Sequence, residues 1–332
     1  MTKVAGSRRG GRVAASIIAA VVGLAIVFGI ALALPVPSVG RVAYTASNDL
    51  NRILAGLESR EVPAGDTTLP ITVGGPSQAP HTLLLLHGYT AEKAIWYQFA
   101  RHLTGQYRVI IPDLAGHGEA RFDPALSYSI PSQADRLSAL LNSLGVRRVV
   151  VVGNSMGGQT AAQFTLRHPS QAEALVVMAP AGVKDPQPSL VEKLLANGTN
   201  PLVVRSRADF NQLISLTAAK PPFLPPAVRA ALAQEFERRA DAYDRIGQDF
   251  LGRDLVEGQL DNISIPCLVI WGEKDEIISP SSAQVWHQHL RNSKLVTMPG
   301  IGHLPMLEDP NGSAQVVAQF IATLPSSAER SR

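Results

Sequence analysis

Apolar and polar positions change their period several times along the chain, and these changes predict the elements of the fold. From about Val62 onward, short apolar runs rich in β-branched residues predict buried strands. They cover residues 82–86, 107–112, 148–152, 174–179, 266–271 and 294–298. Between most of them the spacing is that of amphipathic helices, at 94–104, 131–144, 156–168, 280–290 and 311–323. Strands that alternate with helices predict an α/β fold with a mostly parallel central sheet and helices on both faces.

The segment 181–264 interrupts this alternation, because it contains no strand-like run. A structureless segment of this length is rare in a compact domain. Helical spacing instead recurs at 189–197, 207–219 and 226–246. We therefore expect a helical cap, inserted over the strand ends between the core segments 62–180 and 265–325.

The N-terminal region predicts a membrane anchor. Residues 13–34 are 22 residues without a charge, and a helix of that length spans about 33 Å, enough to cross a bilayer core. Residues 1–12 contain four basic side chains, so we expect them to stay in the cytoplasm. An uncleaved transmembrane signal anchor would then place everything after Leu34 on the non-cytoplasmic side, in the periplasm or outside the cell.

Two other interpretations of this region remain open. A cleaved signal peptide could end at Ala31-Leu32-Ala33, and Ser7-Arg8-Arg9 resembles a twin-arginine export signal. Whether residues 1–33 are removed therefore stays undecided. No cysteine lies near Ala33, which excludes a bacterial lipoprotein anchor.

The segment 35–61 is predicted as a linker, and Pro35 and Pro37 end the membrane helix. Within it, apolar residues recur at helical spacing, at Leu50, Ile53, Leu54 and Leu57. Such a stretch either lies on a membrane surface or packs on the domain. We favour packing.

Composition narrows the class of protein. Apolar residues make up 45% and charged residues 17%, so the chain can bury a sizeable core. Aromatic residues are only 5% and the net charge is only +3, which argues against nucleic-acid binding. The single cysteine, Cys267, precludes an internal disulfide and a cysteine-based zinc site. We expect no metal or other cofactor, and nothing in the sequence indicates the oligomeric state.

A nucleophilic serine is predicted at Ser155. The apolar run 148–152 enters Gly153-Asn154-Ser155-Met156-Gly157, and a helix-like segment follows. This strand, G-x-S-x-G and helix together indicate a nucleophile elbow, a sharp turn that exposes the serine hydroxyl above the sheet.

Serine needs a base and an orienting acid, which follow it along the chain in hydrolases with such an elbow. We expect His303 to be the base, because the glycine-containing loop 298–303 follows a strand, whereas His287 and His289 lie within a helix. The acid is predicted at Asp275, just beyond the strand-like run 266–271. The weaker alternatives are its neighbours Glu273 and Glu276, and Asp113, for which we favour a loop-ordering role.

Two backbone amides are expected to stabilise the oxyanion. One belongs to Met156, next to the nucleophile, and the other to Tyr89, in the loop after the strand 82–86. His87 in the same loop has no second metal ligand at a useful spacing, so we expect it to brace the loop.

These residues together resemble the α/β-hydrolase superfamily over residues 60–323. Within it the chain is most similar to membrane-anchored monoacylglycerol lipases and related bacterial lipases and esterases. The matching pieces are the N-terminal apolar segment, 55–57, 85–89 with Lys93 and Trp96, 113–118, 153–158, 179–182, Asp275 and Gly302-His303.

The resemblance implies a serine hydrolase that cleaves lipid-like carboxylic esters through an acyl-enzyme. The elbow is also similar to that of hydrolases that cleave carbon–carbon bonds in ring-fission products, although those commonly carry tryptophan where this chain has Leu304. A third hypothesis is a membrane-tethered binding protein of the same fold, but such proteins usually lack a member of the triad, and none is missing here.

Overall fold

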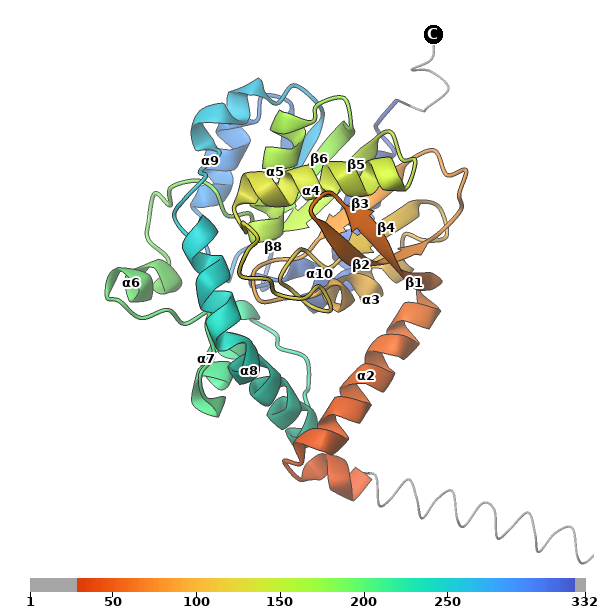
Figure 1. Ribbon diagram of the computed structural model, residues 1–332. Coiled ribbons are helices and arrows are strands. Elements are labelled where there is room, and N and C mark those ends of the chain that lie inside the picture. The colour runs from red at the N-terminus through yellow and green to blue at the C-terminus, as the bar shows by residue number, and fades with distance from the viewer. Residues whose placement is uncertain (1–28, 326–332) are drawn as a thin grey trace, which may run out of the picture. The chain divides into compact units, whose positions relative to one another are not determined.

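The computed structural model describes residues 29–325, and an eight-stranded sheet forms their centre (Figure 1). The order across the sheet is β1-β2-β4-β3-β5-β6-β7-β8. The pairs β1/β2 and β2/β4 are antiparallel and the others are parallel. The strands are β1 (Leu57–Ala64), β2 (Thr67–Gly74), β3 (Thr82–Leu86), β4 (Arg108–Pro112), β5 (Val149–Asn154), β6 (Ala172–Met178), β7 (Cys267–Gly272) and β8 (Ser293–Met298). The expected fold class is confirmed.

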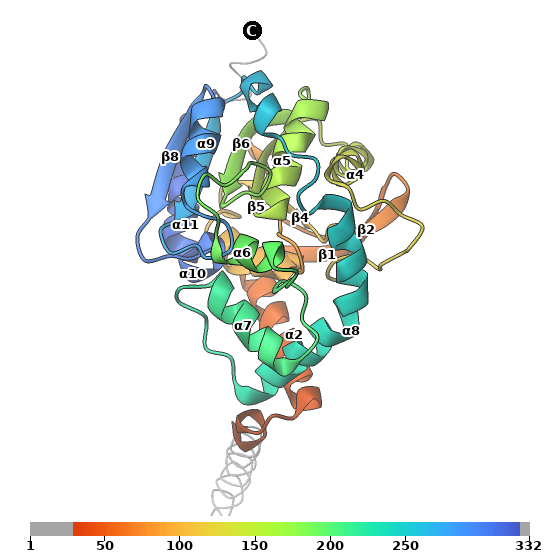
Figure 2. The same ribbon diagram turned by 90° about the vertical axis from the view of Figure 1, so that its left-hand side faces the viewer.

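Helices cover both faces of the sheet, as the continuous apolar runs of its strands require. In β3, Leu84 and Leu86 pack into one cluster of buried side chains, and Leu83 and Leu85 pack into another on the opposite face. The first cluster includes α4 (Ile130–Ser143), α5 (Met156–Arg167) and α9 (Ser282–His289). The second includes η1 (Lys93–Trp96), α3 (Tyr97–Arg101), α10 (Pro305–Glu308) and α11 (Pro310–Ile321), and Figure 2 gives a second view of the two layers.

The expected helical insertion lies between β6 and β7. It contains α6 (Leu190–Ala196), α7 (Arg207–Thr217), α8 (Pro226–Phe250) and η2 (Glu257–Asn262). Helix α8 continues four residues past the predicted end at 246, through Gly247, a poor helix former. The continuation is stabilised by packing, because Ile246 and Phe250 are buried in the first cluster.

The chain forms two compact units. The described part of the smaller one comprises residues 29–47 and 223–235, and the larger one comprises 48–222 and 236–325. In the smaller unit, Gly40 of α2 (Pro37–Leu54) lies against the backbone of Ala227 in α8. A β-carbon at position 40 would lie only 1.9 Å from the Ala227 carbonyl oxygen, so this close approach requires glycine.

Most of the predicted membrane segment 13–34 lies outside the described residues. Its described end is helical over residues 29–33, and the helix stops before Pro35. Between residues 29 and 325, no helix combines the length and the apolar character needed to span a bilayer.

The segment 35–61 contains more regular structure than a linker. Helix α2 fills most of it, and β1 begins inside it at Leu57, where charged, exposed residues hide the strand from pattern analysis. The expectation that the apolar residues of this segment pack on the domain was also wrong for most of them. Leu57 is buried in β1, but Leu50, Ile53 and Leu54 are 56%, 63% and 47% exposed.

Candidate active site

Ser155 occupies a strained turn between β5 and α5. Its backbone has φ 57° and ψ −122°, a region that side-chain-bearing residues rarely adopt. The turn is fixed by two backbone hydrogen bonds, in which Ser155 N–H donates to the Met178 carbonyl (3.1 Å) and Ala181 N–H donates to the Ser155 carbonyl (3.0 Å). Strain that the surrounding structure holds in place is typical of functional sites.

The two glycines of the motif are required by close backbone approaches. A β-carbon at Gly153 would lie 2.1 Å from the Gly157 carbonyl oxygen. A β-carbon at Gly157 would lie 2.4 Å from the carbonyl oxygen of Leu86 in β3. The G-x-S-x-G spacing therefore follows from the tight packing of the elbow against its neighbouring strand.

The structure brings His303 and Asp275 together beyond the ends of β8 and β7. The Nδ1 atom of His303 lies 2.8 Å from Oδ2 of Asp275, and both residues are buried. The other carboxylate oxygen accepts hydrogen bonds from the Ile277 and Ile278 amides. Because the carboxylate takes the proton-bearing Nδ1, the Nε2 atom of His303 is left as an acceptor.

Asn154, the residue before the serine, holds the elbow to the loop that carries His303. Its side-chain amide donates to the carbonyls of Met178 and His303, each at 3.0 Å. The loop that carries Asp275 is also joined to the loop that carries His303, since Lys274 N–H donates to the Ile301 carbonyl at 2.8 Å. Sequence reasoning missed Asn154, because the motif leaves its position free.

The alternative acids next to Asp275 are exposed, and the alternative bases have partners other than Asp275. Glu273 and Glu276 are exposed, on either side of the buried Asp275. Of the alternative bases, His287 Nδ1 contacts the Ser293 hydroxyl and His289 Nδ1 contacts Asp261.

The predicted oxyanion amides lie at the same edge of the sheet. Met156 is the first residue of α5, where a helix leaves its amides without internal partners. The loop after β3 approaches the elbow closely, since a β-carbon at Gly88 would lie 3.0 Å from Cβ of Ser155. Within residues 29–325, neither the Tyr89 nor the Met156 amide has a hydrogen-bond acceptor.

An ionic network, buried at Lys93 and Asp113 and exposed at Glu119, supports the loop that carries Tyr89. Lys93 Nζ lies 2.6 Å from Asp113 and 2.7 Å from Glu119. Burial alone would lower the pKa of Lys93, but Asp113 and Glu119 outweigh it and raise that pKa. His87 Nε2 accepts from the Leu114 amide at 3.0 Å, as expected for a bracing residue. Burial lowers the pKa of His87 against the opposing effect of Asp113, which favours the neutral ring.

The side chain of Tyr89 points to the insertion, because its hydroxyl donates to the Tyr243 carbonyl in α8. Its ring lies edge-on to Phe250, with centroids 5.0 Å apart. The neighbouring His117 is fully buried, which lowers its pKa to about 3, so its ring is neutral. Aromatic packing from α8 thus holds the side chain of Tyr89, the residue after Gly88.

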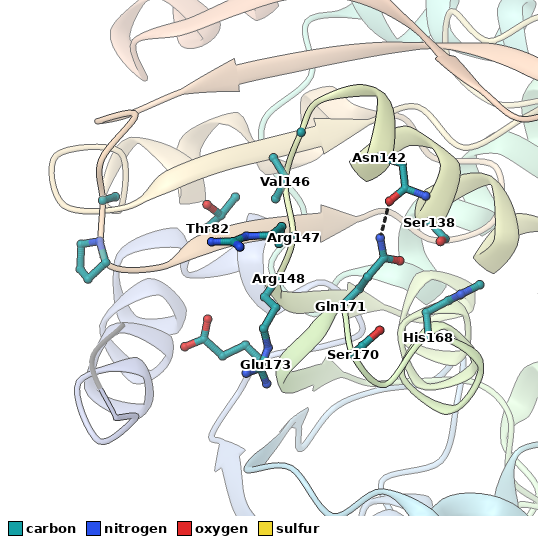
Figure 3. A pocket seen from close by; sticks show the side chains of 13 residues that line it. Thr82, Ser138, Asn142, Val146, Arg147, Arg148, His168, Ser170, Gln171 and Glu173 are labelled. Atoms are coloured by element: carbon teal, nitrogen blue, oxygen red, sulfur yellow. Dashed lines mark hydrogen bonds between the residues drawn. The ribbon is translucent and has the colours of Figure 1, made fainter. Parts of the chain in front are cut away.

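A polar depression of about 1020 Å³ lies at the opposite end of the strands (Figure 3). It is lined by residues at the amino ends of β3, β5 and β6, among them Thr82, Arg148 and Glu173. It is therefore separate from the site at the carboxyl ends, where ligands of parallel sheets collect. No group of three or more histidine, cysteine or acidic side chains suited to a metal occurs in the described part of the chain.

Comparison with known proteins supports the fold. The family model of the alpha/beta hydrolase fold matches residues 81–310. Lipase 1 of Psychrobacter immobilis is 33% identical over 81% of this chain and 84% of its own length. A monoacylglycerol lipase of Xenopus laevis is 26% identical, over 76% of this chain and 78% of its own.

Among solved structures, a membrane phospholipase A described as a novel bacterial virulence factor has a TM-score of 0.83 and 32% identity. The match covers 92% of this chain and 97% of that one. The chain belongs to the α/β-hydrolase family.

Proposed function

We propose that this α/β hydrolase cleaves lipid-like carboxylic esters with a triad of Ser155, His303 and Asp275. The single observation that carries the proposal is the buried Asp275–His303 pair, joined through Asn154 to the strained turn at Ser155. The two sequence relatives given above are lipases, and the chain is a hydrolase of carboxylic esters.

The mechanism follows from the tautomer of His303. Its free Nε2 takes the proton of the Ser155 hydroxyl as that oxygen attacks the acyl carbonyl carbon. Asp275 stabilises the resulting imidazolium, and the amides of Tyr89 and Met156 donate to the oxyanion. The alcohol leaves with the proton from His303, and water then attacks the acyl-enzyme by the same route, releasing the acid.

An apolar substrate is favoured by the helical insertion and by the relatives. Monoacylglycerols are the substrates named for the Xenopus laevis lipase above, and other apolar acyl esters have the same reacting group. The insertion supplies apolar side chains, although several of these pack internally. Phe210 and Phe236, for example, are in ring contact with centroids 5.5 Å apart.

Membrane anchoring by residues 13–34 is part of the proposal. It is supported by the uncharged run, by the basic residues before it, and by the likeness to a membrane phospholipase. The positive charges at the start place the catalytic domain on the non-cytoplasmic side. A reporter that works only in the cytoplasm is fused after Leu34. Activity of that fusion would contradict this topology.

The function is tested with an ester panel of graded acyl length on the full chain. Turnover should rise with acyl length, and Ser155→Ala should abolish both turnover and labelling by a fluorophosphonate. Ser138→Ala, at the opposite end of the strands, is the matched control and should keep full activity. A dienoic diketone in the same panel tests carbon–carbon hydrolysis, and faster turnover of that compound would overturn the ester proposal.

A further inference from the structure

The exposed apolar residues of this protein are concentrated in one short stretch. In the described part of the chain ten large hydrophobic side chains are exposed, and seven of them lie between Ile30 and Leu54. Soluble surfaces scatter such residues singly, whereas a contiguous group marks an interaction site.

Four of the seven lie in helix α2, where they share one face. At about 100° per residue, the apolar face defined by Val42, Ala46, Leu50, Ile53 and Leu54 covers about 120° of the helix circumference. The polar residues Arg41, Thr45, Asn48 and Arg52 lie on the opposite side. Val42 and Ile53 are 64% and 63% exposed, so the described residues leave this face uncovered.

A lipid surface fits this face better than a second protein does. The uncharged run 13–34 ends two residues before α2 begins at Pro37, so a bilayer that holds the run lies next to α2. Arg52 on the polar side pairs with Asp49, the single acidic residue of the helix, and Arg41 leaves one excess positive charge, which suits anionic headgroups. A stable protein interface would need roughly 20 residues a side, far more than this face provides.

We propose that α2 is an interfacial helix whose apolar face inserts into the boundary between headgroups and acyl chains of the bilayer. The inference rests on the proposed membrane anchor, and it deepens the proposed function by identifying a lipid surface as the docking partner. Only Ala55 and Gly56 separate α2 from β1, so the lipid-bound helix leads directly into the catalytic sheet.

The native chain is well suited to a labelling test. Its one cysteine, Cys267, is buried, and burial raises the pKa of the thiol to about 12, so it resists thiol reagents. Leu50→Cys and Ile53→Cys place a fluorophore on the apolar face of the full chain, and Thr45→Cys is the matched control on the polar face. Each labelled protein is reconstituted in vesicles of phosphatidylcholine and phosphatidylglycerol, with and without brominated acyl chains.

We expect brominated lipid to quench the labels at positions 50 and 53 about twofold or more relative to the label at 45. Aqueous iodide should show the reverse order. Equal quenching by iodide at all three positions would overturn the proposal. Protection at 50 and 53 from both quenchers would also overturn it, and would indicate that a second copy covers the face. Failure of the proteins to float with vesicles would overturn the anchor together with the docking.

An activity measurement separates docking from catalysis. Leu50→Glu combined with Ile53→Glu should lower turnover of a vesicle-borne ester about tenfold and leave a soluble short-chain ester unchanged. Thr45→Glu should change neither. Loss of neither activity in the double variant would overturn the proposal. If the unmodified chain fails to hydrolyse the soluble ester, the proposed function fails, while the quenching pattern still tests the docking.

Discussion

Two buried histidine–carboxylate pairs lie at opposite ends of the parallel strands. His303 and Asp275 form the carboxyl-end pair, with Nδ1 and Oδ2 2.8 Å apart. His81 and Glu173 form the amino-end pair, with Nδ1 and Oε1 2.6 Å apart, where β3 and β6 begin. The two pairs are equally buried and have the same chemistry, so the pair alone does not define a catalytic site.

Backbone strain distinguishes the two ends. Four residues other than glycine have a positive φ in the described part of the chain, namely Thr90, Ser155, Ala179 and Asp254. The first three follow β3, β5 and β6 at their carboxyl ends. The amino-end pair instead lies beside the open, polar depression of Figure 3, of which Glu173 forms part of the lining. A catalytic role is thus expected where a pair coincides with strained loops and a helix N-terminus.

The largest effect should come from the carboxyl-end acid. Asp275→Asn should lower kcat for a soluble ester by about ten-thousand-fold, because the amide no longer holds Nδ1–H and the wrong tautomer of His303 faces Ser155. Steady-state kinetics on a p-nitrophenyl ester measure this, with the thermal midpoint as a control for folding. A loss below tenfold in a folded variant would remove Asp275 from the triad.

A smaller loss is expected from the bridge between the elbow and the histidine loop. Asn154→Ala removes both hydrogen bonds of the side-chain amide, so kcat should fall by about ten- to a hundredfold through misplacement of the imidazole. KM should change little. An unchanged kcat would show that the loop keeps its position without this bridge.

The amino-end pair should affect stability and leave catalysis intact. Glu173→Gln weakens a buried charge-assisted hydrogen bond, so the free energy of unfolding should fall by about 1–3 kcal/mol. Denaturant unfolding measures this change, and kcat should stay within about twofold of the unmodified protein. A loss of kcat as large as that of Asp275→Asn would remove the proposed distinction between the two ends.

The smallest effect concerns the carboxyl group of Asp185, beside the loop that carries Asp275. Burial and the nearby Glu192 raise the pKa of Asp185 from 3.8 to about 8, and its Oδ2 accepts from the Ser279 amide at 3.3 Å. Because the folded state holds a proton that the unfolded state releases, stability should fall as pH rises from about 4 to about 8.

Asp185→Asn should remove this part of the pH dependence. The thermal midpoint of the variant should then exceed that of the unmodified protein by a few degrees at pH 8 and by less at pH 5, because the carboxyl is partly exposed. Scanning calorimetry at the two pH values checks the sign. A larger gain at pH 5 would contradict it.

The sequence predicted the central strands better than the edge of the sheet. The limits of β3 match the prediction 82–86, because four consecutive leucines after Thr82 are typical of a strand that is covered on both faces. Strands β1 and β2 were both missed. In β1, Glu58, Arg60 and Glu61 face solvent and erase the apolar signal. The predicted helix 94–104 is shorter in the structure, where η1 and α3 end at Arg101.

At the site, the sequence indicated candidate residues for the chemistry, but it could not show what holds them in place. The order of serine, acid and histidine led to Ser155, Asp275 and His303, and the structure brings the last two into contact. The supporting contacts of Asn154 and of Tyr89 with α8 join residues far apart in the chain. No local pattern predicts such contacts, because they depend on how separate elements pack.

The exposed charges of β1 have a consequence for the behaviour of the protein in concentrated solution. This strand ends the sheet, so its outer edge carries backbone groups that could pair with another chain. Glu58, Arg60 and Glu61 lie along that strand, and Pro63 lacks an N–H to donate. Such residues discourage intermolecular β-pairing, and the strand that was hardest to recognise thus protects the sheet from aggregation.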